Sequence, residues 1–165
     1  MKKFAASLIA VVVLIVVSPV SVLADTWGEP INTPDDRFIV LSSYNDQAVY
    51  DKETGLVWEK SPTTAGLTLS GAHVRCNQLT LGNRKGWRLP TLQELASLVQ
   101  PGQFNPSLPP GNPFTVQLAS YWSATTSSLG SVWFVNFSLG FTNLADSNTG
   151  NIPWCVRGGQ GVDIQ

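Results

Sequence analysis

Two cysteines, Cys76 near the middle and Cys155 near the end, constrain this 165-residue chain more than any other feature. Disulfides form in oxidising compartments and are rare in the cytosol, so the meaning of the pair depends on where the protein resides. A bridge between them would close a loop of about 80 residues, worth roughly 4 to 4.5 kcal/mol by loop entropy. The alternative, a reactive thiol, needs a neighbouring base and an electropositive setting to which the sequence does not point.

The first 24 residues have the pattern of a secretory signal peptide. Lys2 and Lys3 precede an unbroken apolar run over residues 8–17, and small residues before Asp25 offer a cleavage site. The apolar run is short for a bilayer span, although an uncleaved signal is the alternative. We therefore expect an exported protein, periplasmic, at the cell surface or extracellular, without a membrane span after cleavage. In that setting, we interpret the two cysteines as a disulfide.

The net charge of the chain bears on the kind of partner that it can bind. Without Lys2 and Lys3, 8 of the 10 basic residues remain against 11 acidic ones, which argues against nucleic acid as a partner. The basic residues are nevertheless clustered, because Arg75, Arg84, Lys85 and Arg88 fall within fourteen positions. This cluster is either a solvated face beside a helix or a patch for anions such as sulfated sugars.

The remaining sequence reads as one domain over residues 37–160, between a flexible entry segment at 25–36 and a tail at 161–165. Residues 38–41 predict a short strand, and "AVYD" and "LVWE" around "KETG" predict a hairpin. Residues 68–80 have helical spacing, with Ser70 as the expected N-cap. The apolar stripe of this helix comprises Leu69, Ala72, Cys76 and Leu79.

The segment "GWRLPTLQEL" predicts a sharply started second helix. Thr91 and Glu94 form a capping box, and Pro90 keeps the preceding residues Trp87 and Arg88 extended. Helical spacing continues to Val99, before Pro101 and Gly102 end the helix. Every feature of this segment therefore has a structural explanation.

The second half is predicted to be a long loop followed by β-structure. Residues 101–119 contain five prolines, and a loop of this length in a domain is more often functional than idle. Four β segments follow: "SYWSATT", "SVWFVNFS", "FTNLADSN" and "NIPWCVRGG". The second is apolar on both faces, which indicates a central, covered strand.

Signatures of catalysis and metal binding are weak. His73 is the only histidine, lies on the first predicted helix and is interpreted as an ordinary helix residue. Residues 146–151, "DSNTGN", have alternating oxygen donors but lack the closing glutamate of a calcium loop, so an Asx turn is favoured over calcium. We expect no cofactor, no metal site and no enzymatic activity.

Aromatic residues offer one candidate for ligand contact. Trp58, Trp87, Trp133 and Trp154 lie in strand-like runs and are expected in the core. Trp122 follows the proline-rich loop and is the tryptophan expected to contact a ligand.

Five blocks, "YDKETGLVWEK", "AHVRCNQL", "GWRLPTLQEL", "YWSATT" and "WCVRGG", occur in the order found in the Lcl C-terminal domain family. The chain resembles this family of exported bacterial domains over about residues 46–159. The resemblance implies a C-type-lectin-like fold, related in shape to formylglycine-generating enzymes. The family takes its name from a collagen-like adhesin whose end domain is associated with sulfated polysaccharides. The active-site cysteines of the formylglycine-generating enzymes are not carried over, because both cysteines here are assigned to the disulfide.

The sequence thus predicts an α+β fold of C-type-lectin-like type, with two helices packed on a twisted, mainly antiparallel sheet and long loops. We expect a secreted binding module whose loops recognise an extracellular glycan or a surface protein. The alternatives are an envelope structural protein and a divergent enzyme of the formylglycine-generating fold. The candidate ligand-binding residues are Arg84, Lys85, Trp122, Asn143, Asp146 and Asn148.

Overall fold

The computed structural model describes residues 37–159. The predicted signal peptide at 1–24, the entry segment at 25–36 and the tail at 161–165 lie outside these residues. Between residues 37 and 159, no helix has the length and apolar character needed to cross a membrane.

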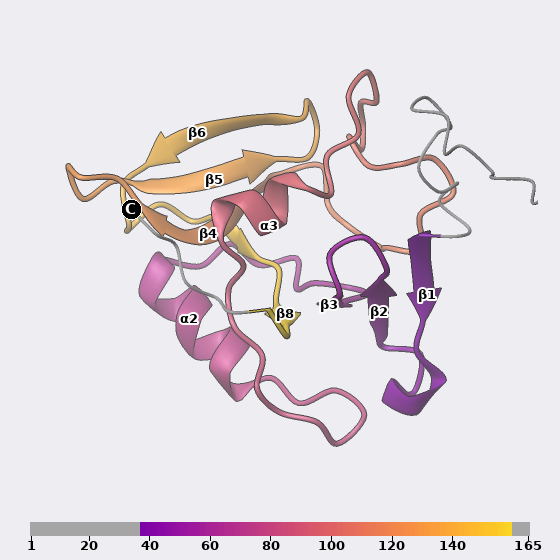
Figure 1. Cartoon of the computed structure of the whole chain (residues 1–165). Coiled ribbons are helices and arrows are strands. Elements are labelled where there is room, and N and C mark those ends of the chain that lie inside the picture. Colours follow the sequence, from indigo (N-terminus) through magenta and orange to yellow (C-terminus); the bar gives the residue numbers. More distant parts are fainter. Residues whose placement is uncertain (1–36, 160–165) are drawn as a thin grey trace, which may run out of the picture. The chain divides into compact units, whose positions relative to one another are not determined.

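The described residues form two four-stranded sheets and two α-helices (Figure 1). The α+β class is therefore confirmed, but the single expected sheet is wrong, because the strands divide between two. The first sheet is antiparallel throughout, in the order β1 (Phe38–Val40), β2 (Ala48–Asp51), β3 (Leu56–Glu59) and β8 (Val156–Arg157). The second has the order β6 (Phe141–Ala145), β5 (Val132–Asn136), β4 (Ser120–Thr126) and β7 (Ile152–Pro153).

The closing segment "NIPWCVRGG" explains the division into two sheets. The sequence pattern suggests one strand, whereas β7 runs parallel to β4 in the second sheet and β8 pairs with β3 in the first. Trp154 and Cys155, between these two short strands, are fully buried. The chain therefore crosses from one sheet to the other through the interior.

The predicted hairpin is confirmed. β2 pairs with β3 in the register Ala48 opposite Glu59 and Asp51 opposite Leu56. Gly55 occupies the turn with a φ of +70°, a conformation that glycine adopts without steric cost. A short 3-10 helix, η1 (Ser42–Tyr44), joins β1 to β2.

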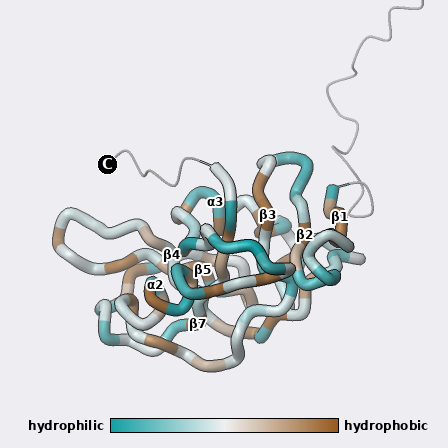
Figure 2. Tube along the Cα trace, turned by 90° about the horizontal axis from the view of Figure 1, so that it is seen from below, coloured by the Kyte–Doolittle hydropathy of each residue, from teal (hydrophilic) through white to brown (hydrophobic). Residues whose placement is uncertain are grey.

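Two hydrophobic clusters share strand β5, as its two apolar faces predict. Val135 and the following Phe137 belong to the cluster around Trp154, whereas Val132 belongs to the cluster around the disulfide. Figure 2 shows hydrophobic residues interspersed with hydrophilic ones along the tube, as expected for elements that bury only part of their surface.

The first helix, α2 (Leu69–Gln78), begins earlier than expected. Its N-cap is Thr68, whose hydroxyl accepts a hydrogen bond from the backbone N–H of Gly71. Ser70 lies inside the helix and is exposed, so its prediction as the N-cap is wrong. The apolar stripe is confirmed, since Ala72 and Cys76 are buried and its outer members pack against the same cluster.

The second helix, α3 (Leu92–Ala96), has the predicted capping box of Thr91 and Glu94. It ends at Ala96 instead of continuing to Val99. The backbone tightens there, because the N–H groups of Leu98 and Val99 bond to carbonyls three residues back.

The proline-rich segment 101–119 contributes to the core. Leu108 is buried, and the ring of Phe114 packs edge-on against Phe38 and Trp154. Its backbone also donates hydrogen bonds to Phe137 O and Lys60 O. This segment is consequently anchored to both sheets.

Candidate functional site

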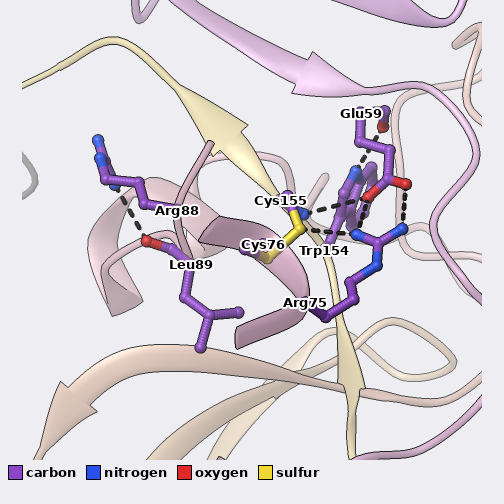
Figure 3. Close-up of a disulfide and its surroundings, with 7 residues drawn as sticks. All are labelled: Glu59, Arg75, Cys76, Arg88, Leu89, Trp154 and Cys155. Carbon is purple, nitrogen blue, oxygen red and sulfur yellow. Dashed lines mark hydrogen bonds and ion pairs between the residues drawn. A yellow bond between two sulfur atoms is a disulfide. The ribbon is translucent and has the colours of Figure 1, made fainter. Parts of the chain in front are cut away.

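The predicted disulfide between Cys76 and Cys155 is present, with the two Cα atoms 5.4 Å apart (Figure 3). It joins α2 to the crossover between β7 and β8, and both residues are fully buried. No free cysteine remains, so the pair has a structural role and offers no thiol nucleophile.

Beside the disulfide, Arg75 is held inside the fold by Glu59. Both guanidinium NH2 groups of Arg75 donate to the Glu59 carboxylate, and one also approaches Cys155 Sγ at 2.7 Å (Figure 3). The Glu59 side chain is almost completely buried. The charge of Arg75 is thus neutralised within the fold.

Arg88 is paired in the same way at the start of α3. Its guanidinium makes two hydrogen bonds of 2.8 Å to the Glu94 carboxylate, and it also donates to Gly158 O. Burial alone would raise the pKa of Glu94, but the bonds from Arg88 and Thr91 outweigh it and hold that pKa below its ordinary value. The "GWRLPTLQEL" segment is structural, as its sequence indicates.

Arg75 and Arg88 are therefore unavailable to an anionic ligand. The other two cations of the cluster, Arg84 and Lys85, lie beside a third cation, Arg157. Arg84 and Lys85 are exposed, and Arg157 on β8 donates from Nε to Lys85 O at 2.9 Å. None of the salt bridges within residues 37–159 involves these three side chains.

Tyr44 contacts both Arg84 and Arg157. The Arg84 guanidinium lies over the Tyr44 ring, 4.8 Å from its centroid, and Arg157 donates to the Tyr44 hydroxyl at 2.8 Å. The tyrosine itself is buried, and its ring makes a T-shaped contact with Trp87. Tyr44, Arg84, Lys85 and Arg157 form what we call the cationic surface.

The loop 79–86 is shaped to bring these groups together. Leu81 and Arg84 exchange backbone hydrogen bonds, and Trp87 Nε1 donates to Arg84 O. At Gly82, which has a φ of +53°, an added Cβ would lie 2.4 Å from Tyr44 Cα. Only glycine allows the loop to approach η1 this closely.

Sequence reasoning identified Arg84 and Lys85 but missed Tyr44 and Arg157. Arg157 is 72 positions from Lys85, and it reaches the loop because Val156 pairs with Arg88. The sequence does contain Arg157, in the "WCVRGG" block. Its position beside Lys85 and Tyr44 depends on how the closing strands cross between the two sheets, which the sequence does not indicate.

Trp122 lies in the core, where no surface ligand can reach it. Its side chain has 0% exposure, and its Nε1 donates to Leu67 O at 2.7 Å. Trp122 is therefore removed from the ligand-binding candidates. Trp58, Trp87 and Trp154 are buried as predicted, whereas Trp133 is only half-buried, toward the β6 edge opposite Leu144.

The remaining candidates lie away from the cationic surface. Asn143 is exposed on β6, and its side chain accepts from the N–H of Leu144. Asp146 accepts through Oδ1 from the N–H of Asn148 and through its carbonyl from Thr149, which is an Asx turn. The turn contacts Leu69 at the start of α2, whereas Arg84 follows its C-terminal end.

His73 lies on α2, facing this turn. Burial lowers the pKa of the imidazole below its ordinary value, so the ring is neutral near pH 7. Among residues 37–159, no group of three or more His, Cys, Asp or Glu side chains could hold a metal ion.

Comparison with protein families finds a match over most of the described residues. The model of the Lcl C-terminal domain family matches residues 47–157, which include both cysteines and the whole cationic surface except Tyr44. No curated protein matches the chain.

Proposed function

The chain belongs to the Lcl C-terminal domain family, and we propose that it is an exported module that binds an anionic polysaccharide through the cationic surface. The observation that carries this proposal is the grouping of Arg84, Lys85 and Arg157 without a carboxylate partner among residues 37–159. The association of a collagen-like adhesin's end domain with sulfated polysaccharides agrees with it.

The chemistry of the three cations suits sulfate and carboxylate groups. A guanidinium presents a planar fork of donors that matches two oxygens of such a group, while Lys85 supplies a mobile point charge. Tyr44 already positions both arginines, which reduces the entropy lost on binding.

The charge of the whole chain limits the affinity of one site. Acidic residues exceed basic ones by one over the full chain, so long-range attraction toward a polyanion is absent. The exposed cations are also screened by salt. We therefore expect weak binding of a single sulfated unit and stronger binding of polymers that present many units.

The fold and location proposed with this function are those of an extracellular lectin-like module, formed by the domain at 37–160. The α+β architecture with irregular connections supports a C-type-lectin-like fold, and the buried disulfide supports export. We propose a binding role without catalysis.

The test compares dextran sulfate with dextran, which share one backbone, by calorimetry on the exported protein. We expect saturable binding of dextran sulfate alone, weakened by added salt. Arg84→Ala/Lys85→Ala should lower the affinity at least about tenfold, the equivalent of about 1.4 kcal/mol. Lys52→Ala/Lys60→Ala removes the same charge elsewhere and should leave the affinity unchanged.

Three outcomes would overturn the proposal. Equal binding of dextran and dextran sulfate would mean that charge is not recognised. Equal losses in the two double variants would mean that net charge, and not the cationic surface, governs binding. The absence of saturable binding to either polymer would also reject it.

A further inference from the structure

A groove on another part of the surface runs between α2 and the turn at residues 146–149. Its volume is about 500 Å³, which falls within the range of small-molecule sites. The groove is lined by Thr68, Leu69, Ser70, His73, Val74, Asn77, Ser147 and Asn148.

The two walls of the groove are fixed to one another. Leu69 N–H donates to Ser147 O at 2.8 Å, and Leu67 N–H donates to Asn151 O at 2.9 Å. The backbones of Gly66 and Gly150 lie so close that a Cβ on Gly66 would be 2.5 Å from Gly150 O. With the Asx turn at Asp146, these contacts define the shape of the groove before any ligand arrives.

The lining has hydrogen-bonding capacity that the fold does not use. Within residues 37–159, no hydrogen bond involves the side chains of Ser70, His73, Asn77, Ser147 or Asn148. Each of these groups can both donate and accept when the imidazole is neutral. The lowered pKa of His73 keeps it in that form at neutral pH.

The lining also lacks charge. It contains no Asp, Glu, Lys or Arg, so an ionised ligand would lose water without gaining a counter-charge. Val74, at 50% exposure, adds an apolar surface on the outer side of the helix. The groove thus combines neutral donor–acceptor groups with an aliphatic patch.

We propose that this groove is a second binding site, which takes a neutral saccharide unit. Neighbouring sugar hydroxyls each donate and accept, which matches the paired functions of Asn77, Asn148 and His73. The C–H face of a sugar ring can pack on Val74. No Phe, Tyr or Trp side chain lines the groove, so we expect weak affinity, on the order of millimolar.

This site does not depend on the proposed function, because the lining of the groove includes none of the four residues of the cationic surface. The test screens the exported protein on an array of neutral glycans and then titrates the strongest binder by NMR. We expect saturable amide shifts centred on residues 68–77 and 147–148.

Two variants on one helix provide the matched comparison. Asn77→Ala removes a lining amide and should lower the affinity at least about fivefold, whereas Gln78→Ala removes an exposed amide outside the lining and should leave it unchanged. Both variants should bind dextran sulfate as the parent does, which separates this proposal from the previous one.

Failure of every neutral glycan to bind would overturn the proposal. Amide shifts located away from the groove, or equal losses in Asn77→Ala and Gln78→Ala, would also overturn it.

Discussion

The buried ion pair of Arg75 and Glu59 is the residue-scale feature with the largest expected effect on stability. In Arg75→Ala, the Glu59 carboxylate stays buried without its partner, so we expect the free energy of unfolding to fall by about 3 kcal/mol. Urea denaturation measures this loss. Glu59→Gln/Arg75→Met removes both charges and should be more stable than Arg75→Ala, and an Arg75→Ala variant as stable as the parent would contradict the argument.

The pH dependence of stability should follow the buried carboxylate of Asp51. Burial alone would raise its pKa, but hydrogen bonds from Arg37 and Thr54 and the charge of Arg37 hold it below the ordinary 3.8. The unfolded chain then binds protons more readily than the folded protein. This stabilising contribution is complete above the ordinary pKa and is lost as pH falls through the lower folded-state pKa.

Urea midpoints between pH 7 and pH 3 test this direction. We expect a loss of stability below about pH 4, to which the lowered pKa of Glu94 adds. Asp51→Asn should have a flatter profile in this range, because its amide does not titrate. Stability that rises between pH 5 and pH 3 would reverse the sign and reject the explanation.

Three arginines illustrate what residue identity alone could predict. The Arg88–Glu94 pair lies six positions apart beside a recognisable capping box, so its structural role could be inferred. Arg75 resembles a surface cation in the sequence, because its partner Glu59 belongs to another element. Arg157 joins Lys85 across 72 positions. Charge can be counted from the sequence, but whether a charge is neutralised depends on tertiary contacts.

At the scale of elements, the loop 79–86 should depend on Gly82. An alanine there would combine a positive φ with a backbone clash against Tyr44, so we expect the loop to move away from η1. Gly82→Ala should lose at least about 1 kcal/mol more stability than Gly55→Ala. The control is matched because Gly55 also has a positive φ, +70°, but has nothing within 4 Å of its added Cβ.

Dextran sulfate binding provides the second measurement on these variants. Gly82→Ala should bind more weakly, since Arg84 moves with the loop, whereas Gly55→Ala should bind as the parent does. Equal stability and equal binding in the two variants would show that the close approach does not position the cationic surface.

Elements defined by local chemistry were predictable, and those defined by distant partners were not. The β2–β3 hairpin and the capping box at Thr91 depend on residues within a few positions of one another. β7 and β8 have two residues each, and their separation is set by the sheets that they join. The burial of Trp122 likewise depends on Leu67, 55 positions earlier.

At the scale of the whole domain, the crossover at Trp154 and Cys155 connects the two sheets, the proline-rich segment and helix α2. Trp154 packs against rings from the first sheet, the proline-rich segment and the end of β5, and its Nε1 donates to Glu59 O. Cys155 holds α2 to the same point. One buried segment therefore fixes the positions of both sheets and the helix that carries the groove.

The disulfide should consequently contribute a large part of the stability of the domain. The bridge spans 79 positions, for which loop entropy predicts about 4 to 4.5 kcal/mol. Cys76→Ala/Cys155→Ala should lose about this much, as should the parent protein treated with a reductant in urea unfolding experiments. Reductant should have no effect on the double variant, which controls for its other actions. A double variant as stable as the oxidised parent would mean that packing around Trp154 alone holds the crossover, and the long loop would then need no covalent constraint.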